Sequence, residues 1–180
     1  MNRPDLSSVD LDAFRTIMGS LTSGVSVVTG LDQEGNPCGM TSSAVCSVSA
    51  DPPLLLTCVK PPSRTLDAIQ ARGCFVVNFL DAEGSEFSDL FASRTRDKFA
   101  RVGWRPSEVV GAPLLDRTVA YAECTVHDRV EAGDHVIVLG RIVSGAVAPE
   151  RFPLGYWRGR YVRVFRVASG VPRRSQDRQE

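Results

Sequence analysis

The chain carries the run GMTSSAVCSVSADPPLLLTCVKPPSRT at residues 39–65. From Met40 to Ser49 the residues alternate so that one face of a strand can join a core and the other presents hydroxyl groups. A strand face exposed to solvent is the alternative explanation of the hydroxyl groups. After a corner at Pro52-Pro53, the apolar run Leu54–Val59 predicts a second strand. The stretch therefore predicts two strands joined at a corner.

The end of the same stretch predicts a helix that begins beside an anion site. Pro61 and Pro62 lack N–H donors and cannot continue a strand ladder, and Ser63 is suited to cap a helix that runs from Arg64 to Ala71. A helix N-terminus carries free N–H groups and a partial positive charge, which attract anions. A plain N-cap followed by a solvated arginine is the alternative.

The fragments GMTSS, SVS, DPPLL and PPSRT, in this order and spacing, resemble the short-chain flavin reductase family. The resemblance extends over roughly Phe14 to Phe165, which is most of the chain. It implies a mainly β fold, a single-domain antiparallel split β-barrel with a few short flanking helices. It also implies FMN or FAD as the bound flavin and NADH or NADPH as the co-substrate.

The resemblance further implies which residues bind the flavin. In the family, the strand after the GMT-like motif lines the flavin ring, the segment after the double proline holds the phosphate, and a loop ending in Lys-Phe folds over the flavin. Backbone N–H groups along residues 43–47 and near Cys58 would stabilise negative charge on the reduced ring. The implied flavin-binding residues are Thr41, Ser42, Ser43, Ala44, Val45, Ser47, Cys58, Val59, Ser63, Arg64, Thr65, Lys98 and Phe99.

A second implied site concerns the nicotinamide. Gly133-Asp134-His135 is expected at a turn before a strand, and the family carries a Gly-Asp-His motif whose histidine faces the nicotinamide side of the flavin. His135 is therefore the implied catalytic residue and, with Tyr156, Trp157 and Arg158, an implied NAD(P)H-binding residue. Considered without the resemblance, His135 is better explained as an exposed turn histidine, and Tyr156, Trp157 and Arg158 are equally explained as surface aromatics beside a solvated arginine. His127 is expected on the surface.

The remaining pattern favours an antiparallel barrel over a parallel sheet, because strands are many and helices few and short. Asp10 is expected to cap a helix whose stripe of apolar residues packs in the core, and a further helix is expected at residues 82–91. Residues 1–10 are expected to be a flexible N-terminus, residues 11–168 the domain and residues 169–180 a disordered polar tail. Further strands are expected at residues 24–29, 74–79, 118–127, 136–143 and 161–167.

Composition narrows the class of protein. A chain of 180 residues fits one domain, and 21 basic residues balance 21 acidic ones, so neither nucleic acid nor a membrane is expected as a partner. No apolar run approaches the roughly 20 residues of a membrane span and no signal peptide is apparent, which indicates a cytoplasmic protein. The five cysteines are expected to be buried free thiols, and no metal site is expected. The chain contains no Gly-x-Gly, so a Rossmann site is excluded, and P-loop and nucleophile-elbow motifs are also missing.

The sequence thus predicts an NAD(P)H-dependent flavin reductase, expected as a homodimer, that supplies reduced flavin to a separate flavin-dependent monooxygenase. The alternative is a split-barrel protein with tightly bound flavin that acts as an oxidase or as a non-catalytic flavin-binding module. The sequence does not distinguish FMN from FAD, NADH from NADPH, or flavin as substrate from flavin as prosthetic group.

Overall fold

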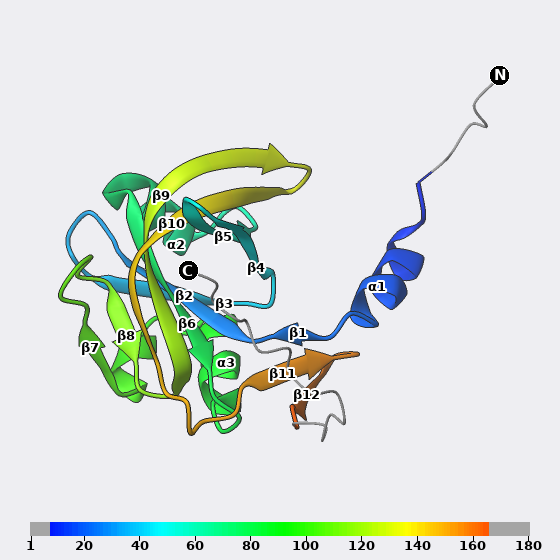
Figure 1. The fold of residues 1–180 in the computed structure, drawn as a ribbon. Coiled ribbons are helices and arrows are strands. Elements are labelled where there is room, and N and C mark those ends of the chain that lie inside the picture. The colour runs from blue at the N-terminus through cyan, green and yellow to red at the C-terminus, as the bar shows by residue number, and fades with distance from the viewer. Residues whose placement is uncertain (1–7, 166–180) are drawn as a thin grey trace, which may run out of the picture.

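The computed structural model describes residues 8–165 and shows a mainly β protein with a few short helices (Figure 1). The expectations for the first seven residues and for the polar tail lie outside the described residues. The helices are α1 (Leu11–Gly19), α2 (Arg64–Arg72), α3 (Ser85–Ala92) and the 3₁₀ helix η1 (Lys98–Arg101). The strands are β1 (Ser23–Gly24), β2 (Ser26–Leu31), β3 (Pro37–Ser42), β4 (Val45–Ala50), β5 (Pro53–Val59), β6 (Cys74–Leu80), β7 (Trp104–Pro106), β8 (Pro113–Leu115), β9 (Thr118–Ala132), β10 (His135–Val147), β11 (Leu154–Trp157) and β12 (Arg160–Arg163).

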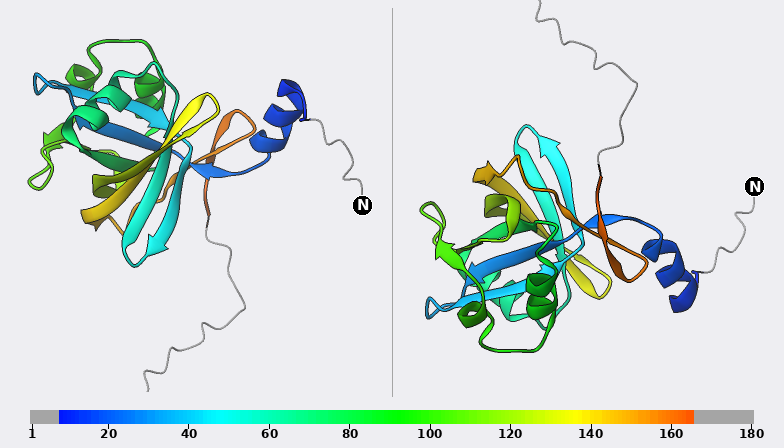
Figure 2. Two further views of the ribbon diagram at one scale, coloured as in Figure 1. Left: turned by 90° about the horizontal axis from the view of Figure 1, so that it is seen from above. Right: turned by 90° about the horizontal axis from the view of Figure 1, so that it is seen from below.

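A seven-stranded antiparallel sheet, in the order β3-β2-β6-β9-β10-β5-β4, forms the body of the molecule. Its two edge strands, β3 and β4, are consecutive in the chain and are joined only by Ser43 and Ala44. In a flat sheet the two edges would be about 29 Å apart, at about 4.8 Å per strand. The three Cα steps from Ser42 to Val45 span at most about 11 Å. The sheet must therefore curl, as the ribbon shows (Figures 1 and 2).

Within residues 8–165 no ladder joins the two edges, because β3 pairs only with β2 and β4 only with β5. Two other contacts hold the edges near each other. The hydroxyl groups of Ser42 and Thr57 are 3.3 Å apart, and the Cys58 N–H donates to the Ala44 carbonyl at 3.1 Å. The antiparallel mainly β fold is thus confirmed, with an open seam between β3 and β4.

The prediction of one continuous strand from Met40 to Ser49 is wrong. The chain bends at Ser43 and Ala44, where the Ala44 N–H donates to the Ser42 hydroxyl at 3.2 Å. A side-chain hydrogen bond of this kind competes with strand pairing and favours a turn. Beyond the bend, the predicted core face is exposed at Cys46 and Val48, and Val45 of the other predicted face packs against the core instead.

Helix α2 begins at Arg64, as predicted, and ends at Arg72, one residue later than predicted. The Ser63 hydroxyl accepts a hydrogen bond from the Leu66 N–H at 3.3 Å, and Gly73 ends the helix in the left-handed conformation, with φ of 66°. The predicted apolar face is buried, since Leu66 is 3% exposed and Ile69 is fully buried in the main core. The start of α2 is therefore fixed against the sheet.

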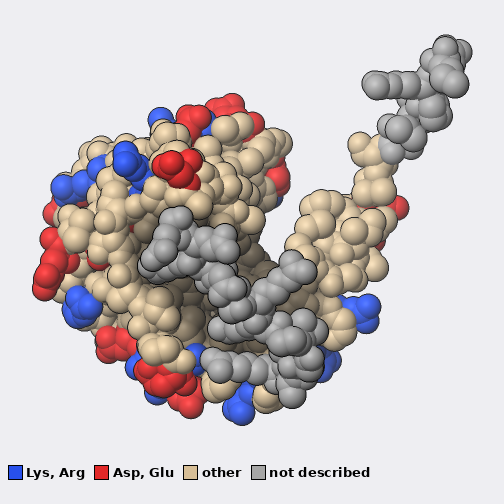
Figure 3. Space-filling model, viewed as in Figure 1, with Lys and Arg blue, Asp and Glu red and all other residues tan. Residues whose placement is uncertain are grey.

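Helix α1 is capped as predicted, with the Asp10 carboxylate accepting from the Ala13 N–H at 2.8 Å. The prediction that its apolar stripe packs in the core is wrong. The helix projects from the body of the molecule (Figures 1 and 3), and none of its residues is buried. The apolar face of the helix carries four side chains that are between 46% and 60% exposed, Leu11, Phe14, Ile17 and Met18, and Leu21, just beyond its end, is 64% exposed. Among residues 8–165, this amphipathic helix therefore has an apolar face that remains exposed.

The last strands also differ from expectation. The strand predicted at residues 161–167 is β12, which ends at Arg163 and pairs with β11 in a separate sheet with β1, so it does not close the large sheet. Residues 166 and 167 lie outside the described residues. The hairpin of β9 and β10 is confirmed and is longer than predicted, and the helix predicted at residues 82–91 begins at Ser85.

The prediction of buried thiols is confirmed for two of the five cysteines. Cys38 and Cys124 are buried, and burial raises their thiol pKa values to about 11 and about 12. Cys58 and Cys74 are half-buried and Cys46 is exposed, which corrects the prediction for Cys46. No group of residues in the described part of the chain has the composition of a metal site, and no described helix is long and apolar enough to cross a membrane.

Gly140 in β10 allows the closest approach in the core. A Cβ at this position would lie 2.5 Å from the Phe75 Cζ and 3.0 Å from the Cys124 Cβ. We expect Gly140→Ala to lower the free energy of unfolding by about 1–3 kcal/mol, because overpacking forces neighbouring side chains to shift. Denaturant unfolding measures the change. Gly24→Ala is the matched control, since its Cβ would meet nothing within 4 Å. Equal stability of the two variants would contradict the expectation.

Candidate ligand-binding site

A cavity of about 430 Å³ opens at the N-terminus of α2. Three segments line it: the first residues of β3, the tip of α2 from Pro62 to Thr65, and the residues from Phe91 to Phe99 that end α3 and lead into η1. The rolled sheet brings the first two segments together, because β3 and the residues after β5 meet near the seam. Of the predicted flavin-binding residues, five line this cavity: Ser63, Arg64, Thr65, Lys98 and Phe99.

The cavity is strongly basic. Arg64, Arg94, Arg96 and Lys98 line it, and none of its lining residues is acidic. Burial lowers the pKa of Lys98, and the nearby Arg64 guanidinium lowers it further. The N–H groups of the first turn of α2 add partial positive charge. This arrangement is suited to a phosphate or another multiply charged anion.

The two cations closest to the helix tip have weak or replaceable partners. Arg64 is 68% exposed and lies 3.7 Å from the Asp32 carboxylate, and its guanidinium is free to turn into the cavity. The Lys98 ammonium donates to the Phe91 carbonyl at 2.7 Å. Ser63, in contrast, is committed to capping the helix and contacts the Met40 sulfur at 3.7 Å, and Thr65 is 3% exposed. Arg64 and Lys98 are thus lining cations whose present partners an anion can replace.

An aromatic wall borders the same cavity. The ring centroids of Phe91 and Phe99 are 5.1 Å apart, and those of Phe99 and Trp104 are 5.5 Å apart, both in edge-to-face geometry. Gly39 lies directly against this wall, because a Cβ there would lie 3.0 Å from the Phe91 ring and 3.1 Å from the Val28 carbonyl. The cavity therefore combines a charged end with an apolar, aromatic side.

A second cavity, of about 320 Å³, adjoins the first, and Ala92 of α3 lines both. It contains Thr41 and Ser43 from the seam and Tyr156 from β11. The Thr41 hydroxyl donates to the Ser88 carbonyl at 2.6 Å, and the Tyr156 ring lies edge-to-face with Tyr161 at 5.6 Å. The structure thus brings three more of the predicted residues together beside the basic cavity.

Other predicted flavin contacts do not line either cavity. Ser42 is 5% exposed and Val59 is fully buried, so their side chains belong to the core. The N–H of Cys58, predicted to stabilise charge on a reduced ring, is already donated to the Ala44 carbonyl. Along β4 and the seam, Ala44 and Ser47 are exposed and Val45 packs against the core.

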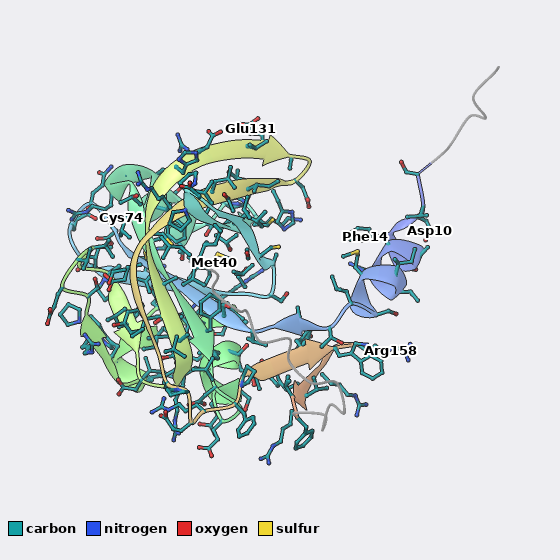
Figure 4. All side chains as sticks on the ribbon, viewed as in Figure 1. Asp10, Phe14, Met40, Cys74, Glu131 and Arg158 are labelled. Carbon is teal, nitrogen blue, oxygen red and sulfur yellow. The ribbon has the colours of Figure 1, made fainter. Side chains whose placement is uncertain are left out.

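The predicted nicotinamide residues are separated in space. His135 is half-buried at the start of β10, where its Nδ1 lies 2.7 Å from an Asp134 carboxylate oxygen. Trp157 donates from its indole Nε1 to the Ser20 carbonyl at 3.2 Å, and the Arg158 guanidinium stacks on the Trp157 ring at 4.6 Å. Both lie beside the end of α1 (Figure 4), away from the basic cavity. His127 is exposed, as predicted.

Several lining residues were not predicted as site residues, among them Gly39, Met40, Phe91, Arg94 and Arg96. In the charged run from Ser93 to Phe99, the family resemblance implied a role only for the last two residues, Lys98 and Phe99. The spacing of Arg94, Arg96 and Lys98, with a cation at every second position, was the signal available in the sequence.

Known proteins resemble this chain over most of its length. The family described as "Flavin reductase like domain" matches residues 18–164. A Kitasatospora aureofaciens protein named flavin reductase (NADH) is 48% identical over 157 residues, which cover 86% of this chain and 82% of that protein. A Mycobacterium tuberculosis protein named flavin-dependent monooxygenase, reductase subunit HsaB, is 35% identical over 160 residues, which cover 88% of this chain and 84% of that protein.

A solved structure of similar fold is the Streptomyces globisporus NADH:FAD oxidoreductase SgcE6 in complex with NAD and FAD fragments. Its TM-score to this chain is 0.84 at 34% sequence identity, and the match covers 91% of this chain and all of that one, 100%.

Proposed function

The chain belongs to the flavin reductase-like domain family, and from this membership we propose that it is an NAD(P)H-dependent flavin reductase that acts on FMN or FAD. The observation that carries the proposal is the basic cavity at the tip of α2. FMN and FAD join a flat ring system to a phosphate, and the cavity offers an aromatic side and four cationic side chains to such a molecule.

Each part of the cavity has a role in holding the flavin. Arg64 and Lys98, with the first N–H groups of α2, bind the phosphate and fix the position of the molecule. Phe91 and Phe99 exclude water from one side. Thr41 and Ser43, which line the adjacent cavity, contact the ring. When bound, flavin supplies the hydride acceptor, so the chain needs no acid–base pair of its own.

His135 is the residue that contacts the nicotinamide. Its Nδ1 is held by Asp134, so its Nε2 is the ring atom that can hydrogen-bond the carboxamide of NADH or NADPH. Tyr156 is a further contact for the dinucleotide, because it lines the cavity that contains Thr41 and Ser43. Trp157 and Arg158 contribute only if the dinucleotide reaches the end of α1.

The reduced flavin leaves the protein and serves a separate flavin-dependent monooxygenase. The similarity to a reductase subunit of such a monooxygenase supports this partner. The proposal includes a cytoplasmic location and a split β-barrel in which the Ser43–Ala44 link joins the edges of the sheet. It also includes a homodimer, in which a second copy covers the apolar face of α1.

The main test is steady-state oxidation of NADH and NADPH by the purified protein with FMN, FAD or riboflavin added. We expect the rate to depend on the added flavin and the dialysed protein to be nearly colourless. A non-catalytic flavin-binding module would bind flavin and leave NADH unoxidised. A flavoprotein oxidase would stay yellow after dialysis and oxidise NADH without added flavin. Either result would overturn the proposal.

The phosphate site predicts a difference between FMN and riboflavin, which lacks the phosphate. We expect Arg64→Gln and Lys98→Gln each to weaken FMN binding about tenfold, the effect of one charge-assisted hydrogen bond, and to leave riboflavin binding unchanged. Fluorescence titration measures both affinities. Arg101→Gln is the control, because Arg101 follows in η1 but does not line the cavity. An equal loss for both flavins would place the phosphate elsewhere.

The apolar face of α1 predicts the assembly. We expect Phe14→Glu combined with Ile17→Glu to convert a dimer into a monomer, because two charges would replace apolar side chains that are more than half exposed in the single chain. Sedimentation or light scattering measures the mass. Thr16→Glu, on the opposite side of the same helix, is the matched control. A wild-type protein that is monomeric would contradict the homodimer.

A further inference from the structure

Three polar side chains form a connected group at the tip of the β9–β10 hairpin, outside both cavities. One Asp134 carboxylate oxygen lies 2.7 Å from the His135 Nδ1, and the other accepts from the Lys60 ammonium at 2.6 Å. Asp134 is thus bonded through both of its oxygens. In the reaction proposed above, Asp134 acts only through its contact with His135, and Lys60 takes no part.

The strand register explains why these residues meet. Val136 of β10 is paired with Val59 of β5, so the next residue after β5, Lys60, is opposite His135. The turn at Gly133, where φ is 64°, then directs Asp134 back toward both side chains. The strand register thus brings the three residues together, although the Lys60 and Asp134 side chains are 63% and 67% exposed.

Asp134 remains ionised over a wide pH range. Hydrogen bonding from Lys60, and secondarily from His135, lowers its pKa to about 2. Asp134 is therefore a carboxylate throughout the pH range in which an enzyme would be assayed, and a carboxylate can only accept hydrogen bonds. The proton in this contact must then lie on the His135 Nδ1, which leaves Nε2 as the free ring atom.

We propose that Asp134 and Lys60 are positioning residues that hold the His135 imidazole in its Nδ1-protonated form, with Nε2 directed to the nicotinamide. Lys60 fixes the carboxylate, and the carboxylate fixes the ring. The catalytic part of this inference rests on the proposed reductase function, but the state of the ring does not.

Lys60 also connects the imidazole to the phosphate end of the site. Only Pro61 and Pro62 separate it from Ser63, the cap of α2, and proline restricts backbone rotation. The positions of the histidine and of the helix tip are therefore coupled through a short, stiff segment. This coupling would keep the nicotinamide contact and the flavin phosphate contact in a fixed relation.

The first test observes the imidazole without any ligand. The chain contains two histidines, so a His127→Gln background assigns the ring nitrogen signals of His135 in NMR spectra. We expect neutral His135 to carry its proton on Nδ1 in the wild type and in Lys60→Arg. Asp134→Ala should shift the proton toward Nε2, and Lys60→Met should give a smaller shift, because exposed ion pairs contribute little. The same protonation state in wild type and Asp134→Ala would overturn the proposal.

The second test is kinetic. We expect Asp134→Ala to raise the KM for NADH about two- to tenfold, the effect of one hydrogen bond, with FMN affinity unchanged. Lys60→Arg should restore what Lys60→Met loses. Glu131→Ala is the matched control, because Glu131 belongs to the same hairpin (Figure 4) and has no side-chain hydrogen bond or ion pair among residues 8–165.

The outcomes distinguish a failure of the proposed reductase function from a failure of the positioning role. If the wild type oxidises no NADH with added flavin, the reductase function fails, and the NMR experiment still decides the state of the ring. If the wild type is active but Asp134→Ala has an unchanged KM for NADH, the positioning role is overturned even though the function stands.

Discussion

The two-residue link between β3 and β4 is the constraint on which the rest of the structure depends. Because it joins the outer strands of a seven-stranded sheet, the sheet has to curl until those strands are neighbours. Curling brings the first residues of β3 close to the segment that follows β5, and that meeting creates the basic cavity. The same bend places Thr41 and Ser43 at the adjoining cavity. Chain connectivity thus brings two walls of the cavity together, and the segment from Phe91 to Phe99 adds the third wall and three of the four cations.

The cavity concentrates positive charge that the protein itself only partly balances. Arg64 is 3.7 Å from a carboxylate outside the cavity, and Lys98 is bonded to a neutral carbonyl. Like charges near one another repel, and the partial burial of Lys98 adds a desolvation cost. A bound phosphate can replace both the Asp32 carboxylate beside Arg64 and the Phe91 carbonyl bonded to Lys98. Relief of this repulsion on binding therefore contributes to the affinity of the protein for an anionic ligand.

The sequence predicted those parts of the fold and of the site that depend only on residues close to one another in the chain. Ser63 followed by a helical apolar face gave the start of α2 correctly, because capping needs only neighbouring residues. The period-two pattern from Met40 onward did not reveal the bend at Ser43, because alternation says nothing about which strand pairs with which. The apolar stripe on α1 led to a prediction of burial in the core that the structure contradicts, because periodicity does not identify what packs against a helix. Arg94 and Arg96 were missed because charged loops are usually solvated.

The positions of the two tryptophans have a practical consequence. Trp104 contacts the ring of Phe99, which borders the basic cavity, whereas Trp157 is bonded to the Ser20 carbonyl at the end of α1. Indole emission from the first will be quenched by energy transfer when a yellow chromophore fills the cavity. Emission from the second will report a change of polarity when α1 becomes covered. The two tryptophans are thus intrinsic fluorescence probes: Trp104 reports a ligand in the basic cavity, and Trp157 reports covering of α1. Replacing either tryptophan by phenylalanine would allow the signal of the other to be measured alone.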